Sequence, residues 1–517
     1  MKRRDFLKGA LASYLTLMAA SEEVFAKTAS LSGGNAKGVV FIAADGWPMG
    51  VAKGTMEFVE RRFKEVSHIS NLLRDKETRI FLQDTSSLSS VVTDSAPASV
   101  AWGTGSKTVN RTLATLPDGR KLTTIIELAK AKGMSCGVVT TTRLTHATPA
   151  AWYSHNSNRD DEDNIAMDIL NLKLDVAMGG GDRHFNAEKR KDGVDLYSKF
   201  SSAGYNILKS KSDLFATKVD DRPILGVFNS SHISYFVDRV NDQKLNENEP
   251  NLPEMTAVAL EKLSRNSKGF VLQIEAGRID HACHANDAYG AMMDCYEMDK
   301  TIAVVLEFIR KNPNVILILA SDHGNSGFGI NGTGPEYNDA TEALFNYNNK
   351  ASFEYMIKKM KNQDLKTVKD IFETYTMQKI TDEEAESIYK KLVEKRTVIS
   401  NDIWYEPDAT MGEILRKSNY EAEKGEKLKK PATVRRGNVG FTSTNHTAEY
   451  QLALVYGVKS YKGKLPNLIQ NTDLYQVMCD HLGLNYKNPV MTAYGSMKFA
   501  RAISNEEWLK HLELHIS

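Results

Sequence analysis

Cysteine is scarce in this sequence, with four residues in a chain of 517, and none of them lies in a CxxC pair. So few cysteines exclude a disulfide framework in a chain of this length, although a single bridge stays open. Charge of one sign is also lacking, because the formal net charge is +1. This balance gives no indication of a nucleic-acid partner or of binding to an anionic membrane surface.

Internal repeats and low-complexity tracts are absent from the sequence, and so is a convincing membrane span. The apolar stretch at about residues 9–20 is too short to cross a bilayer comfortably. It follows the pair Arg3-Arg4 and precedes a small-residue cleavage site at 24–26, so we expect residues 1–26 to be a twin-arginine-like signal peptide. A general secretory signal is the alternative. Either one predicts a periplasmic or secreted protein with no membrane attachment after the signal is removed.

Segments of strand length alternate with helical patterns along the rest of the chain. Strands are expected at 38–45, 87–94, 136–142, 175–180, 223–228, 269–275, 314–322 and 450–457. Several of these runs are hydrophobic throughout, which is typical of strands covered on both faces, and helical stretches such as 123–133 and 288–312 separate them. The pattern predicts an α/β fold with a mostly parallel central sheet and helices on both of its faces.

One segment, residues 330–436, departs from this alternation. It is charged, rich in aromatic residues and mostly helical in pattern, and no strong strand interrupts it. We expect a single domain over residues 27–517 in which 330–436 is an inserted, cap-like segment.

Acids and histidines gather where the predicted strands end. They are Asp45, Asp94, His146, Glu275, Asp280, His281, His284, Asp322 and His323, with Thr148 and Arg159 in the same stretches and His446 just before the last predicted strand. Ligands of doubly wound sheets bind beyond the carboxyl ends of the strands, so these side chains should share one edge. Each is weak evidence alone, because an acid after a strand is often a helix cap and a lone histidine is often an interior residue. Together they would repel one another without cations, and mixed Asp, Glu and His ligation suits Zn²⁺ and Mg²⁺.

The stretch "DSAPAS" raises a separate question about Ser95. Asp94 and Ser95 are favoured helix N-cap residues and Pro97 is tolerated in a first helical turn, so a simple cap is one interpretation. The other is a nucleophilic serine at a helix N-terminus, where small neighbours leave room for an anion.

Five motifs decide between these interpretations. In chain order they read "DSAPASVAWGTGSKT", "HATPAAWYSHNSNR", "IEAGRIDHACHAND", "ASDHG" and "NHTAEY", and with them the chain resembles the alkaline phosphatases from about residue 36 to residue 484. The resemblance implies that Ser95 is the nucleophile and that Arg159 clamps the phosphate. It also implies that Asp94 orients Arg159.

The same resemblance implies three metal sites. One zinc would be held by Asp280, His284 and His446, a second by Asp45, Asp322 and His323, and a third metal, usually magnesium, by Asp45, Thr148 and Glu275. Two departures concern the surroundings of these sites. The stretch around Asp45, residues 44–50, reads "ADGWPMG", whereas many relatives have a shorter loop here. His146 and His281, expected beside the metal ligands, replace the Asp and Lys of some bacterial members, which leaves the identity of the third metal open.

The activity that the resemblance implies is hydrolysis of phosphate monoesters through a phosphoserine, with release of inorganic phosphate. A phosphodiesterase of the same superfamily is the alternative. A sulfatase would carry a Cys/Ser-x-Pro-x-Arg motif, and "SAPAS" lacks the arginine. A binding protein that has kept this fold would be expected to lack a ligand, and none is missing. Many relatives are homodimers, so a homodimer is also open here.

Overall fold

The structure is a computed structural model that describes residues 36–394, 405–416, 436–457, 465–499 and 503–516. The expected signal peptide lies outside the described residues. None of the helices in the described ranges is long and apolar enough to cross a bilayer.

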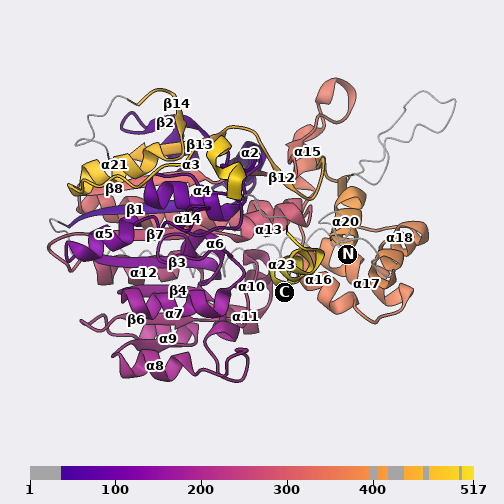
Figure 1. The fold of residues 1–517 in the computed structure, drawn as a ribbon. Helices are drawn as coiled ribbons and strands as arrows, with labels where there is room; N and C mark the ends of the chain where they lie inside the picture. The colour runs from indigo at the N-terminus through magenta and orange to yellow at the C-terminus, as the bar shows by residue number, and fades with distance from the viewer. Residues whose placement is uncertain (1–35, 395–404, 417–435, 458–464, 500–502, 517) are drawn as a thin grey trace.

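A sheet of ten strands forms the centre of the molecule (Figure 1). In spatial order its strands are β14 (Leu468–Gln470), β2 (Arg79–Asp84), β13 (Gln451–Tyr456), β8 (Asn314–Ser321), β1 (Lys37–Ala44), β7 (Phe270–Ala276), β3 (Ser135–Arg143), β4 (Val176–Gly180), β6 (Ile224–Val227) and β5 (Asn206–Leu208). All neighbouring strands pair in parallel except β13, which runs antiparallel to both β2 and β8. The predicted mostly parallel sheet is confirmed.

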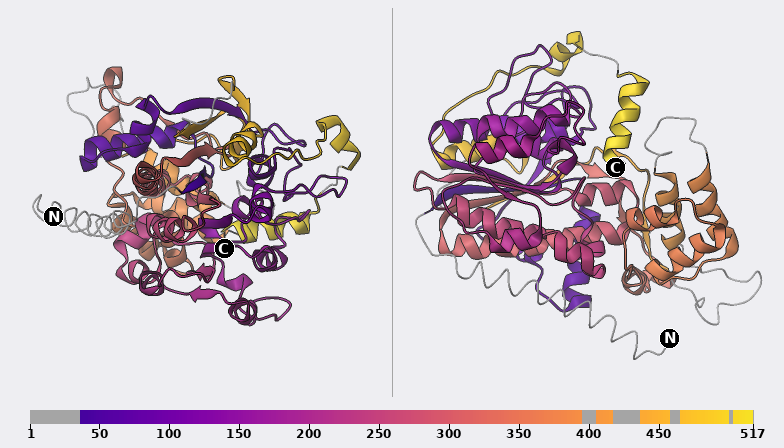
Figure 2. Two further views of the ribbon diagram at one scale, coloured as in Figure 1. Left: turned by 90° about the vertical axis from the view of Figure 1, so that its left-hand side faces the viewer. Right: turned by 90° about the horizontal axis from the view of Figure 1, so that it is seen from below.

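Helices cover both faces of this sheet, as Figure 2 shows. One face packs against α2 (Met49–Glu57), α3 (His68–Arg74), α9 (Lys211–Ala216), α10 (Phe236–Asn241), α12 (Leu252–Leu263), α13 (Arg278–His284) and α14 (Ala288–Lys311). The other packs against α4 (Ser95–Thr104), α5 (Ile125–Ala131), α6 (Ala147–Ala150), α7 (Glu162–Leu172), α8 (Leu196–Ser202) and α21 (Asp473–Leu482). A π-helical turn (Phe58–Phe63) follows α2, and α11 (Gln243–Asn248) joins α10 to α12.

Strand β1 shows why its sequence is hydrophobic throughout. Val40 and Ile42 belong to the core on one face of the sheet, whereas Val39 and Phe41 belong to the core on the other. Successive side chains of a strand point to opposite faces, so a strand with helices on both sides needs an apolar residue at every position.

The strand expected at 87–94 is wrong, because the strand of this region is β2, Arg79–Asp84, and the described backbone at 87–94 is a loop. Serine side chains explain the difference. The hydroxyl of Ser87 accepts hydrogen bonds from the backbone N–H groups of Ser89 and Ser90, at 3.3 and 3.1 Å. Such local bonds give the backbone an alternative to a strand ladder.

The described part of the 330–436 segment is helical. It contains α15 (Ala340–Phe345), α16 (Phe353–Met360), α17 (Leu365–Thr376), α18 (Asp382–Val393) and α20 (Glu406–Arg416), with a short 3₁₀ turn at Pro335–Tyr337. At its base β10 (Gly329–Ile330) pairs antiparallel with β11 (Val439–Gly440). These helices project from the sheet domain beside α13, in orange on the right of Figure 1.

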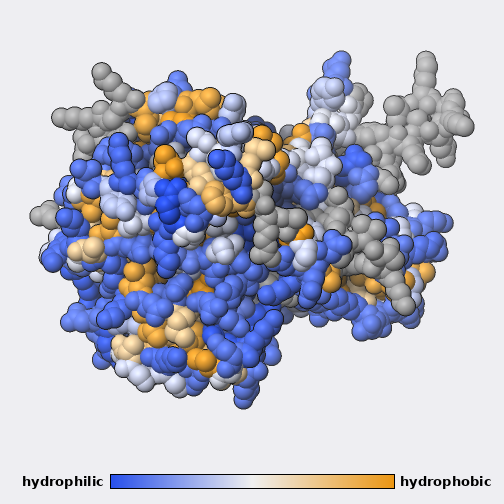
Figure 3. All heavy atoms as spheres, in the orientation of Figure 1, coloured by the Kyte–Doolittle hydropathy of each residue, from blue (hydrophilic) through white to orange (hydrophobic). Residues whose placement is uncertain are grey.

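Two further features concern the cysteines and the surface. All four cysteines are buried and free, so the bridge left open by the sequence is not formed. Exposed apolar side chains occur along the β2–β14 edge, at Ile80, Leu82 and Leu468. This edge is the orange area at the top left of Figure 3.

After α21 the described chain contains α22 (Ala493–Ser496), a 3₁₀ turn (Met497–Phe499) and α23 (Asn505–Ile516).

Candidate active site

The three central strands end level with one another, and carboxylates follow them. Ala44 of β1 lies beside Ala276 of β7 on one side and beside Ser321 of β8 on the other. Asp45 and Asp322 therefore leave the sheet side by side at its carboxyl edge. This is the edge at which the strand-end pattern predicts a ligand site.

Nitrogen and carboxylate oxygen atoms form three groups at this edge, each with its atoms within 4.8 Å of one another. The groups are Asp280, His284 and His446; Asp45, Asp322 and His323; and Asp45, His146 and Glu275. The first two contain the residues expected to hold zinc. In the third, a ring nitrogen of His146 lies among the expected ligands of the third metal, which makes this histidine a candidate ligand rather than only a neighbour.

His446 reaches this edge although it precedes its strand. Strand β13 runs antiparallel to β8, so the amino end of β13 lies at the carboxyl end of β8. A two-residue ladder between β12 (His446–Thr447) and β9 (Gly324–Asn325) then holds His446 against the loop that follows His323.

The rings of His284 and His446 face each other through atoms that cannot hydrogen-bond together. Nδ1 of His284 donates to the carbonyl of Thr444 at 2.6 Å, and Nδ1 of His446 donates to the carbonyl of Thr93 at 2.9 Å. In the neutral rings each Nε2 is then a bare lone pair, and the two Nε2 atoms lie 3.0 Å apart. Two lone pairs directed at one another beside the carboxylate of Asp280 suit a shared cation.

The carboxylates of the site are equally suited to cations. Burial raises the pKa of Asp45 well above its ordinary value, and the charges of Asp322, Asp280 and Glu275 raise it further. Within the described part of the chain, Oδ2 of Asp280 and Oε1 of Glu275 accept no hydrogen bond although they are buried, whereas Oδ2 of Asp322 lies 3.1 Å from Nε2 of His323. Buried carboxylate oxygens without donors are costly, and bound metal ions would remove that cost. The residues present therefore fit metal ions.

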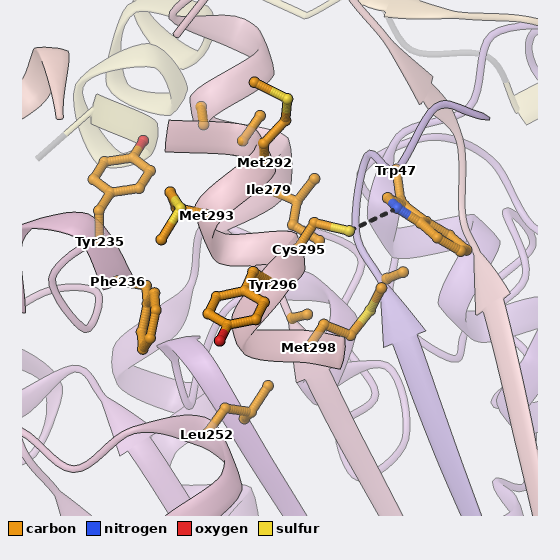
Figure 4. Packing of buried hydrophobic residues seen from close by; sticks show 14 of the residues in the cluster. Trp47, Tyr235, Phe236, Leu252, Ile279, Met292, Met293, Cys295, Tyr296 and Met298 are labelled. Carbon is orange, nitrogen blue, oxygen red and sulfur yellow. Dashed lines mark hydrogen bonds between the residues drawn. The ribbon is translucent and has the colours of Figure 1, made fainter. Parts of the chain in front are cut away.

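The loop after Asp45 is anchored by Trp47, the residue that marks the departure from the shorter family loop. Its indole N–H donates to Sγ of Cys295 on α14 at 3.2 Å, as Figure 4 shows. Gly46 precedes it with a φ of 57°, and a Cβ there would come within 2.4 Å of Oδ1 of Asp280. Glycine is needed at position 46 because the backbone passes so close to a candidate ligand.

Ser95 is the first residue of α4, and the cap interpretation of "DSAPAS" applies to Asp94. The side chain of Asp94 caps the helix by accepting from the backbone N–H of Ala96 at 2.7 Å. Ser95 itself is fully buried, with its Oγ 3.3 Å from Nε2 of His323 and 3.5 Å from Oδ1 of Asp45. A hydroxyl between two candidate metal ligands at a helix N-terminus is placed to lose its proton and to react with an anion held near that helix end.

Arg159 lies beside Asp94, the residue that caps the helix of Ser95. One of its terminal nitrogens lies 3.4 Å from Oδ1 of Asp94, and the other lies 3.0 Å from Nε2 of His146. The salt bridge to Asp94 is the arrangement expected from the sequence. The guanidinium also lines a small cavity together with Arg143, Glu162, Asp160 and His511.

Three threonine hydroxyls donate hydrogen bonds to the carboxylates of the third group, Asp45 and Glu275. Thr148 donates its hydroxyl to Oδ2 of Asp45 at 3.0 Å, and Thr142 and Thr140 donate theirs to Oε2 of Glu275, at 2.7 Å for Thr142. This leaves Oε1 of Glu275 directed at Nδ1 of His146, at 3.8 Å.

His281 lies outside the three groups. Its Nδ1 accepts from the guanidinium of Arg278 at 2.7 Å, and its ring lies 5.5 Å from that of His146. Burial lowers the pKa of both histidines, so both rings are neutral in the ordinary pH range.

Several residues of this region were missed by sequence reasoning. The ring of Tyr405, from the 330–436 segment, stacks on His284 with centroids 5.5 Å apart. Arg278 of α13 pairs with Glu354 of α16 at 2.5 Å, which ties the same segment to the site. Arg143, which forms a buried ion pair with Glu162, carried a signal because it directly follows the strand expected at 136–142, and Arg278 lies within the motif "IEAGRIDHACHAND".

A serine hydroxyl beside clustered carboxylates and imidazoles is an arrangement that metal-dependent hydrolases use, and the guanidinium of Arg159 nearby suits an anionic substrate. Comparison with known proteins narrows this class. A sequence model of the alkaline phosphatase family matches residues 36–484. Alkaline phosphatase 4 of Bacillus subtilis is 33% identical over 392 residues, which are 74% of this chain and 75% of that protein. Alkaline phosphatase 3 of the same organism is 29% identical over 407 residues, 77% of this chain and 79% of that protein.

A solved structure agrees with the sequence comparisons. The crystal structure of Thermus thermophilus alkaline phosphatase superposes with a TM-score of 0.81 at 32% identity, over 90% of this chain and 95% of that one. The chain belongs to the alkaline phosphatase family, which comprises metal-dependent phosphoric monoester hydrolases.

Proposed function

We propose that this chain hydrolyses phosphate monoesters through a phosphoserine intermediate at Ser95. The observation that carries the proposal is the position of the Ser95 hydroxyl in the first turn of α4, 3.3 Å from His323 and 3.5 Å from Asp45. This position places an oxygen nucleophile close to two candidate metal ligands.

The proposed metal ions are two zinc ions and a third ion, magnesium in most of the family. Asp280, His284 and His446 would hold one zinc, and Asp45, Asp322 and His323 the other; Asp45, Thr148 and Glu275, with His146 beside them, would hold the third ion. When bound, these ions supply positive charge that lowers the pKa of the serine hydroxyl and stabilises the oxygens of the reacting phosphate.

The residues of this chain then act in a defined order. Ser95 Oγ loses its proton to solvent and forms a bond to phosphorus, while the bond from phosphorus to the leaving oxygen breaks and that oxygen takes up a proton from solvent to leave as an alcohol. The positive end of the α4 dipole favours the charge of the phosphoryl oxygens, and Arg159 can bind two of these oxygens at once. Water then attacks the phosphoserine, which restores the Ser95 hydroxyl and releases inorganic phosphate.

The test compares matched monoester and diester substrates. Purified protein should release p-nitrophenol from p-nitrophenyl phosphate at alkaline pH much faster than from bis-p-nitrophenyl phosphate. A preference for the diester would replace the proposal by the phosphodiesterase alternative, and absence of both activities after zinc and magnesium are supplied would overturn it.

We further propose that the protein is exported by the twin-arginine route. The support is the Arg3-Arg4 pair ahead of the short apolar stretch, in residues outside those that the structure describes. A receptor reads the arginine pair as an address, so replacing both by lysine should block export. Normal periplasmic yield of that variant would favour the general secretory route instead.

A further inference from the structure

The C-terminal helix α23 lies outside residues 36–484 that match the family, yet it reaches the phosphate end of the site. Two of its residues, His511 and Leu512, are buried, with exposed fractions of 8% and 1%. Figure 2, right, shows this helix in yellow beside the main body, on the side of the orange helices. His511 lines the same small cavity as Arg159.

His511 makes a direct hydrogen bond to the neighbour of the phosphate-binding arginine. Its Nδ1 lies 3.1 Å from Oδ1 of Asp160, and the other carboxylate oxygen of Asp160 accepts from the guanidinium of Arg111. The side chains of His511, Asp160 and Arg111 are all buried, with exposed fractions of 11%, 7% and 12% respectively. Hydrogen bonds that involve a charged group in such a setting are strong and hold their partners in one geometry.

Arg111 links Asp160 to two residues near the N-terminus of α4, Asp94 and Arg159. Its backbone N–H donates to Oδ2 of Asp94 at 2.5 Å, and its carbonyl accepts from the backbone N–H of Arg159 at 2.9 Å. Its φ is 70°, in the left-handed region that is unfavourable for residues other than glycine. Such a conformation persists when surrounding contacts impose it, and the Asp160 salt bridge is one of them.

The charge states agree with these roles. Burial opposes ionisation of Asp160, but the hydrogen bond and charge of His511, with the charges of Arg111 and Arg159, hold its pKa below its usual range. Burial lowers the pKa of His511 despite the opposite effect of Asp160. At alkaline pH the pair is therefore a carboxylate that accepts from a neutral imidazole N–H.

We propose that His511 of α23 is a positioning residue for phosphate binding, which acts through Asp160 and Arg111 on Asp94 and Arg159. The proposal rests on the proposed function, because Arg159 must bind the phosphate for its position to matter. It gives α23 a role in the reaction although the helix lies outside the family match.

The first experiment measures His511→Ala with p-nitrophenyl phosphate, and with inorganic phosphate as the inhibitor. KM and the inhibition constant should each rise about tenfold, the scale of one hydrogen bond to a charged group, while kcat changes less than about twofold. His511→Asn should restore most of the loss, because its amide can donate where Nδ1 does. Lys510→Ala, an exposed neighbour on α23, should match the wild type. Asp160→Asn weakens the same bond from its other end and should raise both constants if His511→Ala fails to fold.

A second experiment separates positioning from general support of the fold. In an Arg159→Ala background, His511→Ala should raise the phosphate inhibition constant by much less than tenfold, because Arg159, the phosphate-binding residue of the two on which it acts, is gone and only Asp94 is left. The same tenfold loss in both backgrounds, or unchanged constants in an active enzyme, would overturn this inference alone. An inactive wild-type protein would overturn the proposed function and this inference with it.

Discussion

Nε2 of His284 lies 3.0 Å from Nε2 of His446, and a backbone carbonyl accepts a hydrogen bond from the Nδ1 of each ring. Both outer contacts are fixed by the fold, so the two inner lone pairs are held together whether or not a cation is present. The same edge of the sheet holds the buried carboxylates of Asp45, Asp280 and Asp322. This edge of the sheet therefore suits positively charged ions.

Chelation should therefore remove activity and lower the thermal midpoint together. Ions that bind only the folded chain stabilise it by mass action, by about 4 kcal/mol when the free ion is at a thousand times its Kd. Differential scanning calorimetry and metal analysis before and after chelation, followed by addition of zinc, would measure both effects.

A histidine control makes this measurement specific. His284→Asn should lose bound zinc, whereas His481→Asn, on α21 away from the site, should keep the wild-type content. An unchanged thermal midpoint and unchanged activity in the chelated protein would show that these residues hold no metal.

Ser95→Ala should lower turnover by about a thousandfold or more, because the proposed route through a phosphoenzyme is lost. Metal content should stay near that of the wild type, since Ser95 is not among the expected ligands. Trapping with labelled phosphate should yield phosphoserine from the wild type and from Ser201→Ala, an exposed serine variant on α8. Labelled phosphoserine from the Ser95→Ala protein would show that the nucleophile is elsewhere.

Arg159→Ala tests which phosphate esters the site prefers. A monoester dianion offers two oxygens to the guanidinium while a third faces the metal ligands, and a diester offers one oxygen fewer and less charge. Charge-assisted bonds of this kind contribute roughly 1.5–3 kcal/mol each, so kcat/KM for the monoester should fall about ten- to several-hundredfold. Arg159→Lys should recover part of this loss. An equal loss for monoester and diester would indicate that Arg159 only supports Asp94.

Acid should weaken the buried ion pair between Arg143 and Glu162. Burial opposes ionisation of Glu162, but Arg143 and His184 lower its pKa from the ordinary 4.5 to about 2. A lowered folded-state pKa stabilises the protein above the unfolded pKa, and that contribution is lost as the pH falls from the unfolded value through the folded one. The Glu162 carboxylate should thus contribute about 3 kcal/mol at neutral pH.

Glu162→Gln measures this contribution. In urea unfolding of chelated protein, the variant should be less stable than the wild type at neutral pH, and the difference should shrink below about pH 4.5. Glu188→Gln, at an exposed site, should show no such difference. A gap between Glu162→Gln and the wild type that stays constant with pH would contradict the ionised pair.

The sequence by itself determined the parts of this protein that depend on local pattern. Fully apolar runs such as that of β1 identified the central strands, because a strand covered on both faces cannot alternate with polar residues. The residues after those strands then identified the candidate ligands, because parallel strands end at one edge. Local pattern failed at 87–94, where serine hydroxyls bind the backbone, and at Arg79–Asp84, an outlying strand exposed at several positions.

Only the tertiary structure decided which distant residues support that edge. His511 follows no strand and belongs to none of the motifs, and it meets Asp160 only because α23 folds back to it. The 330–436 segment brings Tyr405 onto His284 in the same way. The physical reason is that these contacts arise from packing between elements far apart in the chain. Spacing along the sequence carries information about neighbours within an element, and contains none about which elements meet.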